Sequence, residues 1–255
     1  MMAARGVEVF SITDHDTMAA YAELDIAALG ASVIPGIEIN TTYKGNEVHI
    51  LGFGVPVGAS AFADLLERNR RSRRLRVEAM LRQLAAAGYP LTIEMVEAQA
   101  PGGEALGRPH VAKALVAAGY VRDVQSVFET LLKRGGVGYV PSLYITPQQA
   151  IDAIAASGGI PVLAHPGRLE DDGLIDELAE AGLVGLEVFY PTHTRSQVAY
   201  YRNRARQYGL VMTAGSDFHD RRYTDRPVGV EVEREEILPF LELVAPGRIR
   251  APLRE

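Results

Sequence analysis

Histidines and carboxylates gather in short motifs at the ends of apolar runs of this sequence. His15 lies in Thr-Asp-His-Asp, His49 in Val-His-Ile-Leu-Gly, His165 in Ala-His-Pro and His219 in Ser-Asp-Phe-His, while Glu38 stands in Gly-Ile-Glu-Ile. Imidazole and carboxylate groups suit Mn, Fe and Zn alike. Barrel enzymes carry their active sites at the carboxyl ends of strands. The pattern therefore predicts that these side chains converge on a shared metal cluster.

The same motifs contain three further carboxylates, Asp14, Asp16 and Asp217. Asp217 stands two residues before His219, so both side chains can point the same way if the strand continues. His165 precedes a proline, which we expect to hold it in an extended conformation. A single histidine at a strand end is more often a hydrogen-bonded structural residue than a ligand. The joint pattern favours a metal site, because so many polar groups would be costly to bury without metal or mutual pairing.

Short apolar runs alternate with helix-like stretches along most of the chain. The expected strands cover residues 7–12, 32–39, 48–53, 160–164, 183–189, 210–214 and 228–232. Several are apolar at nearly every position, as in strands covered on both faces. Capping signals at Thr146 and Thr194 predict helices over residues 146–157 and 194–209. The alternation predicts an α/β fold with a mostly parallel sheet.

Residues 59–140 do not follow this alternation. We predict that they form a helical insert within a domain formed by residues 1–58 and 141–255. Its predicted helices cover residues 62–87, 92–99, 109–118 and 124–132. The first of them carries a run of arginines: Arg68, Arg70, Arg71, Arg73, Arg74 and Arg76. We expect a solvated face opposite an apolar side. The alternative is a basic wall that attracts a polyanionic substrate.

Composition narrows the class of protein. With 255 residues, the chain is long enough for one large α/β domain. It has no cysteine, which excludes disulfides, thiolate zinc sites and a cysteine nucleophile. We find no membrane-spanning apolar run and no signal peptide, so we expect a soluble cytoplasmic protein without a membrane partner. A net charge of −6 argues against a stable complex with nucleic acid but permits a local basic pocket.

Together the motifs resemble the PHP (polymerase and histidinol phosphatase) family. The likeness rests on residues 13–17, 35–38, 49, 164–166 and 215–219, and it extends over residues 6–232. Within the family, the chain is most similar to stand-alone bacterial phosphoesterases that act on nucleoside 3′,5′-bisphosphates and short RNA ends. The resemblance implies a distorted (β/α)7 TIM-like barrel with two or three Mn²⁺, Zn²⁺ or Fe²⁺ ions and a helical insert beside the active face.

The resemblance also implies ligand sets. Glu38, His49 and His165 match the ligands of one metal. Asp217 and a bridging Glu38 match those of a second, and His15 and His219 match those of a third. Asp14 and Asp16 are then expected to orient His15 and its strand end.

One family motif is missing. Family members carry His-x-His on a first strand, followed shortly by an aspartate, whereas this chain begins Met-Met-Ala-Ala-Arg-Gly, which is similar to the end of the next helix. A barrel without its first strand would have an edge of unpaired backbone groups. We therefore expect the true start to lie upstream of Met1. The alternative is a degenerate member that holds fewer metals.

The implied reaction is hydrolysis of a phosphate ester by a metal-bound hydroxide, without a side-chain nucleophile. Cationic side chains would hold the remainder of a small phosphorylated substrate, because a guanidinium grips phosphate oxygens at two points. The candidates are Arg108, His110, Arg168, His193 and Arg195. For Arg108 and His110 the alternative is helix-capping polarity, and for His193 it is a loop histidine.

Three further functions stay open. An amidohydrolase-type enzyme that cleaves C–N bonds would need a bridging ligand such as lysine, yet Lys44, Lys113 and Lys133 do not follow predicted strands. A phosphodiesterase or exonuclease that acts on a short oligoribonucleotide would differ from a bisphosphate phosphatase only in substrate. A pseudo-phosphatase that binds ligand without turnover is favoured by the missing motif.

Overall fold

Two sheets form the strand layer of the fold. The computed structural model describes residues 6–26, 30–58, 62–100, 105–219 and 228–245. Residues 1–5, which make up most of the sequence before the first strand, lie outside these ranges. Strands β1 (Val9–Phe10) and β2 (Ser32–Val33) pair in parallel. A five-stranded sheet has the order β3-β4-β5-β6-β7, with bounds Gly36–Tyr43, Asn46–Phe53, Ile160–Leu163, Gly185–Phe189 and Val211–Ala214. Strands β5, β6 and β7 are parallel, whereas β4 is antiparallel to both β3 and β5.

The expectation of a mostly parallel sheet is therefore wrong for the first half of this sheet, and the β3–β4 hairpin explains why. Lys44 and Gly45 form its turn with φ values of 48° and 82°. A two-residue hairpin needs this left-handed pair, which glycine adopts readily. Strands joined by two residues must run antiparallel. The hairpin also extends β3 to Tyr43 and starts β4 at Asn46, beyond the predicted bounds.

Other predicted strands are shortened, divided or replaced. Residues 7–12 form only β1, and the predicted strand 32–39 is interrupted between β2 and β3, where Pro35 cannot donate to a ladder. The predicted strand over residues 228–232 is wrong, because this segment is irregular. An unpredicted helix, α9 (Arg234–Val244), follows it with Pro239 in its interior. Helix α9 was not predicted from the sequence, because a proline normally breaks a helix.

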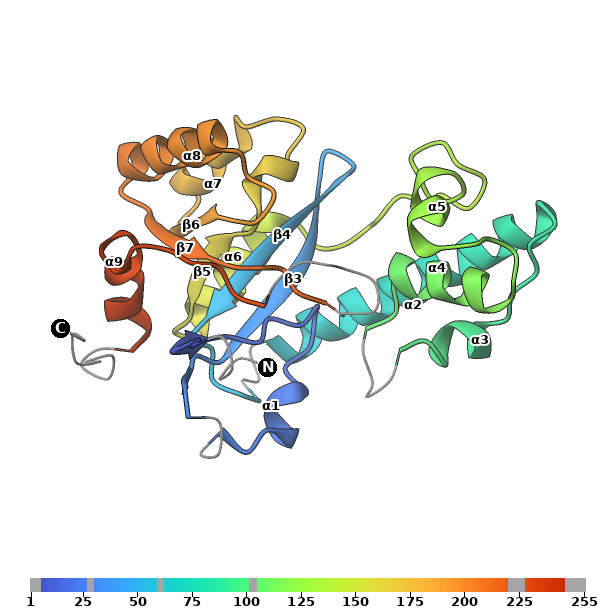
Figure 1. Cartoon of the computed structure of the whole chain (residues 1–255), viewed down its shortest axis with the longest axis horizontal. Helices are drawn as coiled ribbons and strands as arrows, with labels where there is room; N and C mark the ends of the chain where they lie inside the picture. Colours follow the sequence, from blue (N-terminus) through green and yellow to red (C-terminus); the bar gives the residue numbers. More distant parts are fainter. Residues whose placement is uncertain (1–5, 27–29, 59–61, 101–104, 220–227, 246–255) are drawn as a thin grey trace.

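Helices cover both faces of the five-stranded sheet (Figure 1). On one face, α6 (Pro147–Ala156), α7 (Leu174–Glu180) and α8 (Arg195–Tyr208) bury an apolar core against β3 to β6. On the other face, α9 packs Phe240 against Phe53 with ring centroids 5.0 Å apart. The predicted caps of α6 and α8 are confirmed, because Thr146 and Thr194 accept hydrogen bonds from the amides of Gln149 and Gln197.

Four helices form a separate lobe, seen to the right of the sheet in Figure 1: α2 (Ala63–Ala86), α3 (Ile93–Glu97), α4 (Arg108–Ala117) and α5 (Val124–Glu129). We call these helices the helical lobe; they share an apolar cluster around Met80, Leu84 and Leu115. In the described ranges, no helix has the length and apolar character needed to cross a membrane.

The prediction that the arginines of α2 form a solvated face is wrong for two of them. Arg73 and Arg76 are buried, with 5% and 8% of their surface exposed, and they contact Asp16 and Glu47. Together with buried Asn69 they recur at helical spacing and face the β3–β4 hairpin. The other arginines of the run are exposed: Arg68, Arg70, Arg71 and Arg74.

Tyr21 in α1 (Ala20–Glu23) joins the segment before His15 to the start of β3. Its buried hydroxyl lies 2.6 Å from the Ile12 carbonyl oxygen, and it accepts hydrogen bonds from the amides of Ile12 and Gly36, both at 2.9 Å. Gly36 is needed here, because a Cβ would lie 2.3 Å from Ser11 Oγ. This contact positions the strand that carries Glu38.

Tyr21→Phe removes only the hydroxyl and should lower the free energy of unfolding by about 1–3 kcal/mol, because two amides lose their acceptor. Tyr120→Phe is the matched control, since its hydroxyl makes an exposed hydrogen bond of 3.2 Å to the Pro90 carbonyl. We expect that variant to change stability by less than about 0.5 kcal/mol. Chemical denaturation measures both, and equal small effects would contradict the assignment.

Candidate metal centre

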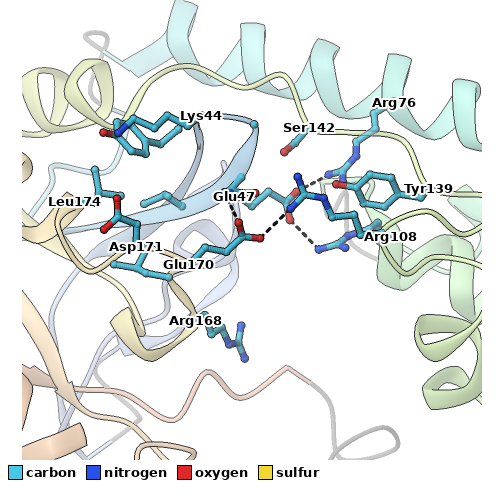
Figure 2. Close-up of a pocket in the computed structure, with 16 residues that line it drawn as sticks. Lys44, Glu47, Arg76, Arg108, Tyr139, Ser142, Arg168, Glu170, Asp171 and Leu174 are labelled. Atoms are coloured by element: carbon cyan, nitrogen blue, oxygen red, sulfur yellow. Dashed lines mark hydrogen bonds and ion pairs between the residues drawn. The ribbon is translucent and has the colours of Figure 1, made fainter.

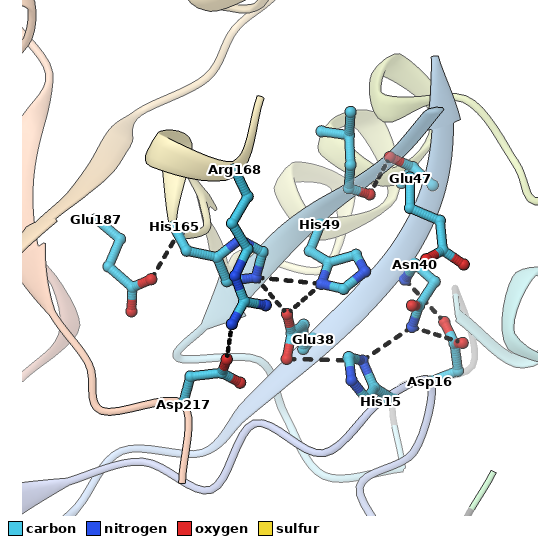
Figure 3. Close-up of polar contacts among 12 residues, drawn as sticks. His15, Asp16, Glu38, Asn40, Glu47, His49, His165, Arg168, Glu187 and Asp217 are labelled. Carbon is cyan, nitrogen blue, oxygen red and sulfur yellow. Dashed lines mark hydrogen bonds and ion pairs between the residues drawn. The ribbon is translucent and has the colours of Figure 1, made fainter. Parts of the chain in front are cut away.

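Three of the predicted ligands meet around the carboxylate of a fourth, Glu38 (Figure 3). Its Oε1 lies 2.7 Å from His49 Nδ1 and 3.2 Å from His165 Nε2, and its Oε2 lies 3.6 Å from His15 Nδ1. The nitrogens of His49 and His165 approach each other to 3.2 Å. Side chains far apart in the sequence therefore share one carboxylate, and we call this group the Glu38 cluster.

Strand pairing brings the Glu38 cluster together. The segment that carries His15 runs beside β3, with a parallel bridge between His15 and Glu38. Two backbone hydrogen bonds flank that bridge: the amide of Glu38 donates to the Asp14 carbonyl at 3.1 Å, and the amide of Asp16 donates to the Glu38 carbonyl at 2.9 Å. His49 lies on β4, and His165 follows β5 on the far side of β4.

Backbone strain is concentrated at this site. Asp16, His165 and Asp217 have φ values of 53°, 27° and 47°, a region that non-glycine residues occupy uncommonly and that recurs at functional sites. The expectation that Pro166 holds His165 extended is therefore wrong. The left-handed conformation lets the chain leave β5 for a short 3-10 turn (Pro166–Arg168) while the imidazole turns to Glu38.

The other two predicted ligands lie at the margin of the Glu38 cluster. The ring of His219 lies 5.8 Å from that of His15, and its Nδ1 lies 3.4 Å from Asp217 Oδ1. Asp217 Oδ2 accepts hydrogen bonds from Arg168 Nη2 at 2.9 Å and from the Tyr190 hydroxyl at 2.8 Å. Strand β7 ends at Ala214, so an irregular segment, and not a continued strand, brings these two side chains together.

The charges of the Glu38 cluster suit a divalent cation. Burial lowers the pKa of His15 to about 3, so its imidazole is neutral and offers a lone pair. Burial opposes ionisation of Glu38, but His15 and His49 hold the pKa of this carboxyl well below its usual range. Metal ligands must be deprotonated in this way. Ligand atoms of His15, Glu38 and His49 all lie within 4.8 Å of one another, close enough to share one ion.

The side chain of Glu187 holds the backbone of His165. Its Oε2 accepts a hydrogen bond of 2.7 Å from the His165 amide, and burial raises the pKa of this carboxyl to about 7. Gly215 leaves the space that Glu187 occupies, because a Cβ there would lie 2.1 Å from Glu187 Oε1. The glycine of the Gly-Ser-Asp-Phe-His motif thus makes room for a side chain of the neighbouring strand β6.

A cleft of about 260 Å³ lies between the β3–β4 hairpin, helices α2 and α4, and the segment after β5 (Figure 2). In it, Glu47 bridges Arg76 of α2 and Arg108 of α4, with 2.8 Å between Glu47 Oε2 and Arg108 Nη2. Burial would raise the pKa of Glu47, but Arg108 and Arg76 lower it to about 2. Lys44, Arg134 and Arg168 also line this space, which we call the arginine cleft.

The predicted substrate-binding residues occupy different places. Arg108 and Arg168 line the arginine cleft. His110 is buried and caps α4, because its Nδ1 accepts a hydrogen bond of 3.1 Å from the Gly107 amide. His193 joins the turn after β5 to β6: its Nδ1 donates to the Val188 carbonyl and its Nε2 accepts from the Gly167 amide. Arg195 is exposed in the first turn of α8.

Sequence reasoning missed several polar residues that contact the site. Asn40 stands two residues after Glu38, and Glu47 two residues before His49, so each shares a strand face with a predicted ligand. Period-two spacing could have identified both. Arg73 and Arg76 carried no such signal, because their partners Asp16 and Glu47 are distant in the sequence.

Several characterised proteins are similar to this chain, although no family model matches it. Phosphoribosyl 1,2-cyclic phosphate 1,2-diphosphodiesterase of Eggerthella lenta is 36% identical over 225 residues, 86% of each chain. The 5′-3′ exoribonuclease Rnm of Escherichia coli is 35% identical over 84% of this chain and 75% of its own. The 3′,5′-nucleoside bisphosphate phosphatase of Chromobacterium violaceum is 32% identical over 89% of this chain and 82% of its own.

Solved structures agree with these relatives. A candidate metal-dependent phosphoesterase from Bifidobacterium adolescentis matches with a TM-score of 0.85 and 28% identity, over 95% of this chain and 88% of that one. A Chromobacterium violaceum protein described as an amidohydrolase, with bound sulfate and no metal, matches with the same TM-score and coverage at 31% identity. With such relatives along most of its length and the motifs gathered around Glu38, the protein belongs to the PHP family of metal-dependent phosphoesterases.

Proposed function

We propose that the protein hydrolyses a phosphate ester of a small nucleotide-like substrate, either a nucleoside 3′,5′-bisphosphate or a short oligoribonucleotide. The observation that carries this proposal is that strand β4 contributes to both the Glu38 cluster and the arginine cleft. Strand β4 places His49 in the cluster and, two residues earlier, places Glu47 between Arg76 and Arg108. Relatives named for bisphosphate, RNA and cyclic phosphate substrates support the same substrate class.

In this proposal the sheets belong to a distorted (β/α)7 barrel. Residues 1–58 and 141–255 form the barrel, and residues 59–140 form an insert beside the active face. Support comes from the parallel order β5-β6-β7, the segment around His15 that runs beside β3, and the separate apolar cluster of the helical lobe.

Six side chains would hold divalent Mn, Zn or Fe ions: His15, Glu38, His49, His165, Asp217 and His219. When bound, such ions supply Lewis acidity that polarises phosphoryl oxygens and lowers the pKa of water. Glu187 fixes the His165 backbone, and Asp14 and Asp16 fix the segment that carries His15. These contacts hold the ligands in place before substrate arrives, which lowers the reorganisation needed for reaction.

The arginine cleft would bind the anionic remainder of the substrate. Arg76 and Arg108 approach from two helices of the helical lobe, and Glu47 occupies their guanidinium groups in the free protein. Phosphate oxygens can take over these hydrogen bonds in bidentate geometry. Arg168 lines the same cleft and donates a hydrogen bond to Asp217, so it lies between the arginine cleft and this predicted ligand.

Metal removal tests the proposal directly. Protein treated with a chelator should lose phosphate release from adenosine 3′,5′-bisphosphate and nucleotide release from a short oligoribonucleotide, and added Mn²⁺, Zn²⁺ or Fe²⁺ should restore one of them. A ribose 1,2-cyclic phosphate ester and an amide serve as comparison substrates. Metal-bound protein that turns over neither phosphate substrate would contradict the proposal and support a ligand-binding pseudo-enzyme.

Glu38→Gln should lower turnover by at least ~100-fold, the scale seen when a central electrostatic group is lost. The same change should lower the metal content, because the amide supplies no negative charge. Glu242→Gln, at an exposed position on α9, is the matched control and should leave both unchanged. Turnover in Glu38→Gln close to that of the control would remove Glu38 from the centre of the site.

Arg108→Met should raise KM for a nucleoside 3′,5′-bisphosphate by about 10–100-fold, because a charged hydrogen-bond partner of the substrate is lost. The effect should be much smaller for a mononucleotide with a single phosphate. Arg82→Met, on the exposed side of α2, is the control. An equal change of KM for both substrates would show that Arg108 does not bind the second phosphate.

A further inference from the structure

The arginine cleft contains a buried hydroxyl that the rest of the protein does not use. Ser142 has 2% of its surface exposed, and its Oγ has no hydrogen-bond partner among the residues that the structure describes. Native proteins rarely leave a buried polar group unpaired, because its lost contact with water is then not compensated. Of the unpaired buried atoms in the described ranges, this one lines the cleft. The hydroxyl is therefore a hydrogen-bond donor that a ligand of the cleft can use.

Backbone contacts with α2 fix Ser142 beside Arg76 (Figure 2). Arg76 Nε donates a hydrogen bond of 2.8 Å to the Val140 carbonyl, two residues before the serine. Ser72, one turn earlier on α2, donates a hydrogen bond of 2.9 Å to the Leu143 carbonyl, one residue after it. Helix α2 thus holds this segment on both sides of Ser142, so the hydroxyl and the Arg76 guanidinium keep a fixed relation to each other.

The carboxylate of Glu47 has the position of an anion between two guanidinium groups. Its Oε1 accepts a hydrogen bond from Arg76 Nη1, and its Oε2 accepts one of 2.8 Å from Arg108 Nη2. Each oxygen is engaged by one arginine, and two positive charges face a single negative charge. Because 32% of the Arg108 side chain is exposed, an anion from solution can approach it. Glu47 therefore fills an anion position and leaves one positive charge uncompensated.

Positive charge also prevails in the cleft as a whole. Five cationic side chains line it, against three carboxylates: Lys44, Arg76, Arg108, Arg134 and Arg168, against Glu47, Glu170 and Asp171. A concave surface lined mainly by one sign of charge attracts ligands of the other sign. The cleft thus favours an anionic ligand over a neutral or cationic one.

The number of oxygens identifies the anion. A terminal phosphate monoester offers three free oxygens and about two negative charges. A phosphodiester offers two free oxygens and one charge, which is what Glu47 already supplies. A monoester, in contrast, can contact Arg76, Arg108 and Ser142 at the same time and can compensate both guanidinium groups.

We infer that the arginine cleft selects a terminal phosphate monoester: this phosphate displaces Glu47 from Arg76 and Arg108, and Ser142 donates a hydrogen bond to its third oxygen. The inference rests on the proposed function and narrows its substrate. The group held away from the metal centre is a phosphate at the end of the molecule, as in a nucleoside 3′,5′-bisphosphate, and is not an internal phosphodiester.

The first test measures the affinity of metal-free protein for methyl phosphate and for dimethyl phosphate, followed by NMR of the Arg76 and Arg108 side chains. At about pH 8 methyl phosphate carries two charges, because the second pKa of a phosphate monoester is about 6. We expect methyl phosphate to bind more tightly than dimethyl phosphate. Ser142→Ala should weaken methyl phosphate binding by about 5–10-fold, the scale of one hydrogen bond to a charged group, and should leave dimethyl phosphate binding unchanged.

Ser72→Ala is the matched control. It removes a hydroxyl that contacts the same segment but does not line the cleft, so both affinities should stay unchanged. Thermal unfolding supplies a second readout. Ser142→Ala should leave the unfolding midpoint unchanged or raise it, because the Ser142 hydroxyl has no protein partner to lose in the described ranges.

The second test uses Glu47→Gln, which keeps the size of the side chain and removes its charge. If Glu47 occupies the phosphate position, this change should tighten methyl phosphate binding by about 2–5-fold, the scale of a partly exposed ion pair. Glu242→Gln, at an exposed position on α9, is the control and should change nothing.

Four results would overturn the inference: unchanged methyl phosphate affinity in Ser142→Ala, an equal loss in Ser72→Ala, a lowered unfolding midpoint in Ser142→Ala, or weaker binding in Glu47→Gln. These measurements need neither metal nor turnover. A protein that binds methyl phosphate as expected but hydrolyses no phosphate ester would count against the proposed function alone.

Discussion

The buried carboxylate of Glu38 on strand β3 determines which groups can surround it. Glu38 has 6% of its surface exposed, and such a charge is stable only beside groups that compensate it. Three imidazoles approach it from the segment before β3, from β4 and from the end of β5. Because Glu38 is shielded from solvent, the carboxylate and the imidazoles depend on one another, and a divalent cation shared among them would compensate the negative charge of Glu38.

The convergence of His15, His49 and His165 on Glu38 could be predicted from the sequence, because each of these residues lies in or next to an apolar run. The helix caps at Thr146 and Thr194 could also be predicted, since a capping box is formed by residues only three positions apart in the sequence. The division of the β3–β4 region into a hairpin was not predicted, although Lys44-Gly45 is a turn signal. The conformation of His165 was predicted wrongly, because its ring and its amide are held by Glu38 and Glu187, which lie far away in the sequence.

The burial of two α2 arginines was also not predictable, because it depends on residues that lie far away in the sequence. A run of arginines on an amphipathic helix ordinarily faces water. Here Arg73 and Arg76 have acidic partners on the segment after β1 and on β4, and no local pattern could have separated them from Arg70 or Arg74. The residues that sequence reasoning missed are those whose role depends on a partner in another element.

The contact between α2 and the β3–β4 hairpin differs in kind from the apolar packing inside the helical lobe. Asn69, Arg73 and Arg76 meet Asp16, Asn40 and Glu47 through directional polar bonds, while the lobe keeps an apolar cluster of its own. A junction of this kind specifies orientation through a few positions and leaves the rest of the lobe free to diverge. Substitutions elsewhere in the lobe would then leave the hairpin that carries Glu38 and His49 in place, as long as those few positions are retained.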